Sequence, residues 1–164
     1  MSPGHMQLKP IGVIHSPFLQ SAGAPIQSRM AHGAEGEVVV DQEYAAGLKD
    51  LEGFERIWLL YWFDRAASGE ARLVVRPYLD DAERGVFATR APARPNPIGM
   101  SPVRLISVQG NVLRIADVDI LNDTPLLDIK PYVPHFDSYA TNRNGWFDAV
   151  RDRSTVADGR FEAG

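Results

Sequence analysis

The sequence predicts a mainly β protein, a single small β-barrel with one or two short helices. Many short apolar segments, rich in Val, Ile and aromatic residues, are separated by turn residues along most of the chain, a pattern typical of barrels and sandwiches. The run from Arg56 to Phe63 is apolar and aromatic almost throughout, so we expect it to be the central strand, buried on both faces. With 164 residues, the chain is long enough to bury one hydrophobic core.

The same pattern assigns the other elements in order. Strands are expected at 7–15, 37–40, 73–75, 86–89, 103–108, 112–115, 117–121 and 126–130. Gln109-Gly110-Asn111 separates two of these strands, and Gly and Asn favour a tight hairpin there. Asp41 is a good N-cap for apolar residues at helical spacing, so a short helix is expected over 41–51. A further helical turn is expected at 146–150.

One barrel domain is expected over residues 10–150. Residues 1–9 are interpreted as an N-terminal extension, and Met1 to Met6 has the pattern of a cloning remnant. Residues 151–164 turn polar and are expected to form a loose C-terminal tail.

Composition excludes several classes of protein. Cysteine is absent, which removes disulfides, thiolate zinc sites, iron–sulfur clusters and cysteine nucleophiles. The four histidines lack the spacing of metal ligands, so no metal is expected. No run is long enough to span a bilayer and the start has no secretory pattern, so we expect a cytoplasmic protein without a membrane partner.

Charge is uneven along the chain. The net charge of −4 argues against non-specific coating of DNA, which needs many phosphate contacts. Residues 72–104, however, contain six arginines and three acidic residues. An anionic partner could therefore bind to this third of the chain.

The most informative stretch is the proline-rich segment, residues 85–102. Its four prolines restrict the backbone to an extended path and remove N–H donors. It presents Arg90 and Arg94 beside Thr89, Asn96 and Ser101, a set suited to binding a carboxylate or phosphate through forked, charged hydrogen bonds. The alternative is a structural turn with solvated arginines.

A second notable stretch runs from Leu121 to Tyr132. Asn122-Asp123-Thr124-Pro125 predicts a turn, and Asp128 and Lys130 lie on the same face of the strand expected after it. In isolation they could equally be a surface ion pair of little energetic worth. In isolation, the polar segment 25–29 is expected to be a loop. Asp64 and Arg65 follow the apolar strand and could equally be a solvated cap at its end.

Together these motifs resemble the TrmO/TsaA-like (YaeB) tRNA methyltransferases. The resemblance covers about Pro10 to Tyr132 and rests on motifs in family order, namely Ile11-Gly-Val-Ile-His-Ser-Pro17, Leu51-Glu-Gly-Phe-Glu-Arg-Ile-Trp-Leu-Leu60, Gly85-Val-Phe-Ala-Thr-Arg90, Arg94-Pro-Asn-Pro-Ile-Gly-Met-Ser101 and Asn122-Asp-Thr-Pro-Leu-Leu-Asp-Ile-Lys-Pro-Tyr132. The chain is similar to a short form without the C-terminal domain of longer members. It also departs from the family pattern at Asp64, where many relatives have His, and at Asp123, where many have Gly.

The resemblance implies a β-barrel methyltransferase that binds S-adenosylmethionine near a homodimer interface. Its acceptor would be N6 of threonylcarbamoyladenosine next to the anticodon of tRNA. Either arginine of the proline-rich segment could pair with the methionine carboxylate. Carried over by motif, the contacts to the cofactor fall on Pro25, Ile26, Gln27, Asp64, Arg65, Arg90, Arg94, Leu105, Asp123, Thr124 and Pro125.

Methyl transfer depends mainly on aligning the acceptor with the sulfonium methyl, so few dedicated residues are needed. Asp128 is our candidate to orient or deprotonate the acceptor, and Lys130 would neutralise nearby charge. Two alternatives stay open, namely transfer to another RNA or a small molecule, and a non-catalytic S-adenosylmethionine-binding module.

Overall fold

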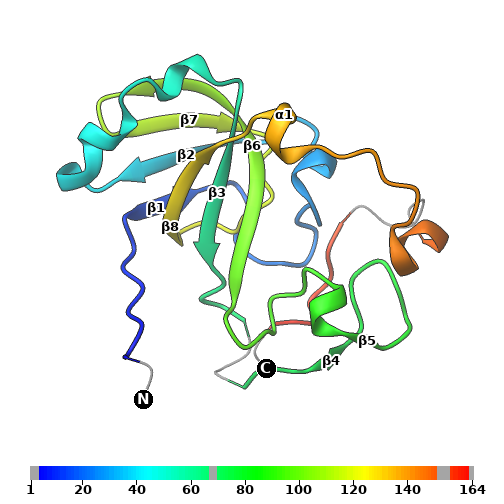
Figure 1. Ribbon diagram of the computed structural model, residues 1–164. Helices are drawn as coiled ribbons and strands as arrows, with labels where there is room; N and C mark the ends of the chain where they lie inside the picture. Colours follow the sequence, from blue (N-terminus) through cyan, green and yellow to red (C-terminus); the bar gives the residue numbers. More distant parts are fainter. Residues whose placement is uncertain (1–3, 67–69, 151–155, 163–164) are drawn as a thin grey trace.

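A closed six-stranded β-barrel forms the centre of the protein (Figure 1). The computed structural model describes residues 4–66, 70–150 and 156–162. Every neighbouring pair of barrel strands is antiparallel. In barrel order the strands are β1 (Gly12–His15), β2 (Glu35–Val40), β7 (Val112–Ala116), β6 (Ile98–Gln109), β3 (Arg56–Trp62) and β8 (Thr124–Pro131).

The expected barrel, and the tight hairpin between β6 and β7, are confirmed. Gln109 pairs with Val112 across a two-residue turn, and Gly110 has a φ of +61°, a conformation that glycine adopts without a steric penalty. β6 is longer than expected because residues 98–102 of the proline-rich segment pair with β3.

The strand β3 is not buried on both faces as expected. Ile57, Leu59 and Tyr61 are buried in the barrel interior, whereas Trp58 and the other alternate residues are partly exposed. A barrel strand has one inner and one outer face, so the side chains on the outer face of β3 keep part of their surface exposed. Trp58 instead packs against the ring of Tyr132, with 5.6 Å between ring centroids.

Two expected strands are not strands. Residues 86–89 form a 3₁₀ helix, Val86–Ala88, because the Thr89 hydroxyl donates to the Val86 carbonyl and local side-chain bonds compete with strand pairing. Residues 117–121 form no ladder, since Asp117 has a φ of +62° and ends β7. Its carboxylate accepts hydrogen bonds from Gly33 and Arg56.

The expected helix over 41–51 is instead two 3₁₀ helices, Gln42–Leu48 and Leu51–Gly53. Asp50, with a φ of +67°, separates them. Asp41 stands at the N-cap position, but its side chain makes no capping hydrogen bond. The remaining short elements are the 3₁₀ helices Ser28–Met30 and Gly145–Ala149 and the α-helix α1 (Pro134–Asp137).

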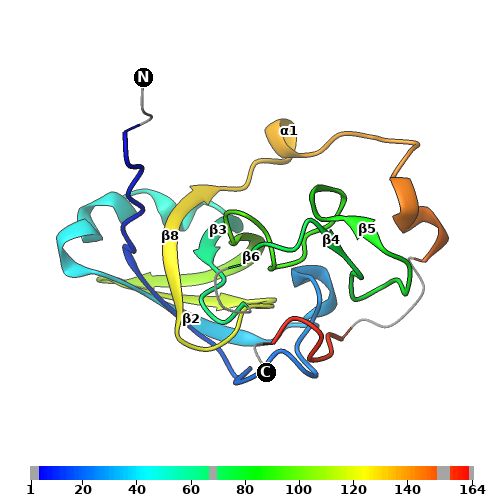
Figure 2. The same cartoon turned by 90° about the horizontal axis from the view of Figure 1, so that it is seen from below.

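A small lobe lies beside the barrel (Figures 1 and 2). It contains the two-stranded sheet of β4 (Val74–Val75) and β5 (Arg84–Gly85) and has its own apolar cluster around Val86 and Phe161. Phe161 belongs to residues 156–162, which we call the C-terminal segment. The expected loose tail is therefore packed against the protein over these residues, while 151–155, 163–164 and residues 1–3 lie outside the described residues.

A glycine in β6 shows how tightly the open end of the barrel is packed. A Cβ added at Gly99 would lie 2.2 Å from the Tyr61 ring and 2.8 Å from the Phe63 ring, and these two rings already pack edge to face. We expect Gly99→Ala to lower the free energy of unfolding by about 1–3 kcal/mol, as overpacking generally does.

Urea denaturation measures this effect. Gly47→Ala is the matched control, because nothing lies within 4 Å of a Cβ at that position. Equal unfolding free energies for Gly99→Ala and the control would contradict the expected packing.

Candidate functional site

A cavity of about 1170 Å³ opens at one end of the barrel. The end of β3 and the starts of β6 and β8 meet there, since Tyr61 pairs with both Gly99 and Leu126. Tyr61, Asp119 and Thr124 line its barrel side. The other lining residues are 19–21, 24–27, 63–66, 77–79, 87–92, 94, 98–100, 120, 121, 144, 146, 147, 157, 161 and 162.

Arg94 holds the proline-rich segment in shape. Its Nη1 donates to the carbonyls of Thr89 and Ala91 at 2.9 and 3.1 Å and to that of Val86 at 3.3 Å. The Thr89 and Ala91 carbonyls lie outside any strand, so the guanidinium supplies donors to backbone groups that no ladder pairs, whereas the Val86 carbonyl also accepts from Thr89. Arg94 lines the cavity, but one edge of its guanidinium is already hydrogen-bonded to backbone carbonyls.

Arg90 is freer to meet a ligand. It lines the same cavity, is exposed, and donates through Nη1 to Gln27 Oε1 at 2.7 Å. Arg65 lies on another side and donates to the carbonyls of Leu19 and Asn122. It thereby ties the turn before β8 to the loop after β1.

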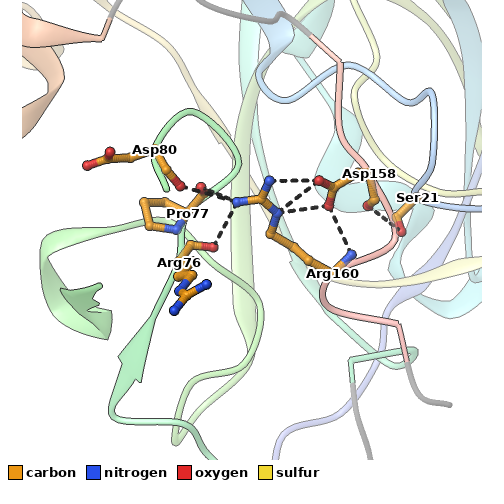
Figure 3. Close-up of polar contacts among 6 residues, drawn as sticks. All are labelled: Ser21, Arg76, Pro77, Asp80, Asp158 and Arg160. Atoms are coloured by element: carbon orange, nitrogen blue, oxygen red, sulfur yellow. Dashed lines mark hydrogen bonds and ion pairs between the residues drawn. The ribbon is translucent and has the colours of Figure 1, made fainter. Parts of the chain in front are cut away.

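The C-terminal segment closes one side of the cavity. Figure 3 shows Arg160 between the Asp158 carboxylate and the backbone carbonyls of residues 76–80. Its Nη1 donates to the Pro77 carbonyl at 2.7 Å, and its Nη2 lies 2.7 Å from Asp158 Oδ2. The Ser21 hydroxyl bonds to Glu162 at 2.6 Å, so residues 156–162 connect the lobe to the loop after β1.

Asp119 is the unusual polar group of the cavity. The residue is half-buried because it borders the cavity, but its Oδ1 is shielded and has no hydrogen-bond partner among the described residues. Burial raises the pKa of its carboxyl from 3.8 to about 7, although a hydrogen bond with Ser101 and the positive charge of Arg90 oppose the rise. Ser101 also bonds to the Tyr61 hydroxyl at 2.9 Å, and burial raises the pKa of Tyr61, which stays neutral.

The structure brings most of the expected cofactor-binding residues together. Those that line the cavity are Pro25, Ile26, Gln27, Asp64, Arg65, Arg90, Arg94 and Thr124. Leu105, Asp123 and Pro125 do not line it. Leu105 packs against the barrel core, and Asp123 pairs with His15 at 2.9 Å on the surface.

The expected catalytic pair also lies apart from the cavity. Asp128 and Lys130 form an exposed ion pair of 2.9 Å on β8. The Asp128 carboxylate also accepts from the Ile129 amide at 2.9 Å. The catalytic roles expected for these two residues stay predictions, and the ion pair is the contact that the structure shows for them.

Sequence reasoning missed several residues that line the cavity, among them Tyr61, Asp119, Trp146 and Phe161. One signal for Asp119 was present, because it is an acidic residue between Val118 and Ile120, both of which are buried. Trp146 had no local signal. Its indole N–H donates to the Ala88 carbonyl across 58 positions of sequence.

The comparisons with known proteins agree with this geometry. Residues 13–138 match the family model of the tRNA-methyltransferase O N-terminal domain. A probable S-adenosyl-L-methionine-binding protein of Pyrococcus abyssi is 54% identical over 93% of this chain and 83% of its own length. A tRNA (adenine(37)-N6)-methyltransferase of Escherichia coli is 39% identical over 80% of this chain and 60% of its own.

A solved structure supports the same relation. The crystal structure of TrmO from Pseudomonas aeruginosa superposes with a TM-score of 0.76 at 36% identity, covering 93% of this chain and 66% of that one. The fold and site define a small β-barrel protein with a ligand cavity at the open end of the barrel. This chain belongs to the family of the tRNA-methyltransferase O N-terminal domain. Among the described residues, none of the helices has the length and apolar character needed to cross a membrane.

The contacts of Arg160 allow the first test of the site. We expect Arg160→Ala to lower the free energy of unfolding by about 2 kcal/mol, because it removes several hydrogen bonds of a charged group. Hydrogen exchange should also become faster at residues 156–162 and 77–79. Arg114→Ala is the control, since its exposed ion pair with Glu35 is worth less than about 1 kcal/mol. Unchanged exchange in Arg160→Ala would contradict the role of this contact.

Asp119 should make the stability of the ligand-free protein depend on pH. A carboxyl with a raised pKa binds more protons in the folded than in the unfolded state, so its contribution to stability falls as pH rises. From its pKa of about 7, the loss falls between about pH 4 and pH 7 and amounts to at most about 4 kcal/mol. The difference in unfolding free energy between wild type and Asp119→Asn isolates this effect, because other carboxyls cancel. Parallel pH profiles would contradict the burial of this group.

Proposed function

We propose that this protein is an S-adenosylmethionine-dependent methyltransferase that acts on N6 of adenine 37 in tRNA, as the name of its Escherichia coli relative states for that enzyme. The observation that carries the proposal is the cavity that collects residues from segments far apart in the sequence, including eight residues expected from family motifs. Its volume of about 1170 Å³ is slightly above the roughly 300–1,000 Å³ of typical small-molecule sites, so it has room for a cofactor of that class.

The lining fits the parts of S-adenosylmethionine. Phe63, Phe87 and Trp146 offer aromatic faces, which suit an adenine ring and attract a sulfonium cation. Arg90 offers guanidinium donors that a carboxylate can accept. When ionised, Asp119 supplies a negative charge that can pair with the positively charged end of this zwitterionic ligand.

The chain's own residues contribute chiefly by positioning. S-adenosylmethionine, when bound, supplies an electrophilic methyl group on sulfur. The proline-rich segment, braced by Arg94, and the C-terminal segment, held by Arg160, would exclude water and fix the orientation of the ligand relative to the acceptor. The acceptor nitrogen loses a proton in the overall reaction, which water or a nearby carboxylate can accept.

Finer features of the proposal go beyond this cavity. We infer threonylcarbamoyladenosine as the modified nucleoside and a homodimeric state from the family resemblance, and a cytoplasmic location stays the expectation of the sequence analysis. Catalytic roles for Asp128 and Lys130 stay predictions. Arg72 and Arg76, which border a second hollow of about 480 Å³ beside β4, and Arg84, which pairs with Asp80, are the candidates to contact tRNA phosphates.

Methyl-labelled S-adenosylmethionine with total tRNA tests the proposed activity. We expect label in an N6-methylated adenosine derivative after nucleoside analysis. Arg90→Ala should weaken cofactor binding by about 10- to 150-fold, as expected when a hydrogen bond between charged groups is lost. The control Arg114→Ala should retain wild-type affinity. Tight binding without transfer would favour a binding module, and label in another acceptor would contradict the proposed substrate.

A further inference from the structure

Asp119 has a hydrogen-bond acceptor that the protein itself leaves unused. Its Oδ1 is buried without a partner among the described residues, although the residue lines the cavity. Buried polar atoms are nearly always paired in folded proteins, and an exception calls for an explanation such as a ligand. Thr124, which lines the same side of the cavity, directs its hydroxyl to the Leu121 carbonyl at 2.7 Å. The missing donor is therefore expected to come from the contents of the cavity.

The surroundings of Asp119 restrict what that donor can be. Arg90 acts electrostatically on both Asp119 and Tyr61, so a positive and a negative side chain face the same part of the cavity. A sulfonium has no N–H or O–H group to donate. An α-amino acid carries an ammonium and a carboxylate on one carbon atom, and therefore matches two opposite charges that lie near each other.

We propose that Asp119 binds the α-ammonium group of the amino-acid part of S-adenosylmethionine through Oδ1, while Arg90 binds its α-carboxylate. The proposal rests on the proposed function and names a residue that family motifs did not assign. Asp119 is a ligand-binding residue in this account and takes no part in moving the methyl group. Specificity follows, because a nucleoside without the amino-acid part leaves both charges unpaired.

Proton exchange accompanies this binding. The titratable and charged groups that face Asp119 are the neutral phenol of Tyr61 on β3 and the guanidinium of Arg90, and the Ser101 hydroxyl on β6 and the backbone amides of Ser28 and Asp119 also act on its carboxyl. Burial keeps the pKa of Asp119 near 7 in the free protein, and a bound ammonium favours the ionised carboxylate. Binding at pH 6 should therefore release a proton to the solvent, and affinity should rise with pH through about 7.

Three ligands separate the possible roles of Asp119. S-adenosylmethionine and S-adenosylhomocysteine share the amino-acid part, only the first has a sulfonium, and 5′-methylthioadenosine has neither. At pH 8 most Asp119 side chains are ionised. There we expect Asp119→Asn to lower the affinity for each of the first two ligands by at least tenfold, and by the same factor for both. The affinity for methylthioadenosine should change less than twofold. Titration calorimetry measures all three, with Glu35→Gln as a control on the barrel surface.

Each other outcome is informative. Unchanged affinities would overturn the proposal, as would an equal loss for all three ligands, which would indicate a structural role. A loss confined to S-adenosylmethionine would assign Asp119 to the sulfonium instead. A wild-type protein that does not bind S-adenosylmethionine would refute the proposed function itself.

The wild type provides a second test that does not depend on the folding of Asp119→Asn. Calorimetry of S-adenosylhomocysteine binding at pH 6, in buffers of different ionisation enthalpy, counts the protons released. We expect release of a substantial fraction of one proton at pH 6, and net proton uptake at pH 9, where Asp119 is already ionised and the ligand's own α-amino group must be protonated to bind. No release at pH 6 would contradict the ammonium contact.

Discussion

One guanidinium nitrogen of Arg94 organises the wall on which the cavity depends. Three backbone carbonyls between Val86 and Ala91 accept hydrogen bonds from this nitrogen. The prolines on either side of Arg94 in the sequence further restrict the backbone conformations of the segment. Arg94 belongs to the proline-rich segment, which the sequence predicted to bind a ligand. Its main structural effect is to hold the backbone, and this leaves Arg90 to face the cavity contents.

The barrel supplies the rigid side of the same cavity. Inner residues of β3 and β6 pack to the very end of the barrel, where Tyr61, Ser101 and Asp119 form a hydrogen-bonded group. Segments far apart in the sequence then close the space, and Arg65 and Arg160 hold two of them to backbone carbonyls. Arginine suits this work because its planar fork satisfies several acceptors at once. The rigid barrel and the braced loops together preorganise a site for a charged ligand.

Local signals predicted the barrel, its hairpin and much of the cavity, but side-chain partners decided the rest. The short apolar segments and the Gly110-Asn111 turn are local signals, so the sequence alone could predict the barrel and its hairpin. Residues 86–89 have strand-forming side chains, yet the Arg94 and Thr89 bonds hold them as a 3₁₀ helix. Asp123 shows the limits of a motif, because its φ of +63° is one that glycine, common there in the family, adopts freely. Trp146 and Phe161 reach the site only through contacts between distant segments, which no local pattern reports.

A crystal structure of the complex with S-adenosylhomocysteine tests the central claim most directly. The account predicts the ligand in the cavity between the proline-rich segment and the open end of the barrel. Its ammonium nitrogen should lie within about 3.2 Å of Asp119 Oδ1, and its carboxylate should face Arg90. A ligand bound outside this cavity, or one whose adenine rather than its amino-acid part meets Asp119, would contradict the account.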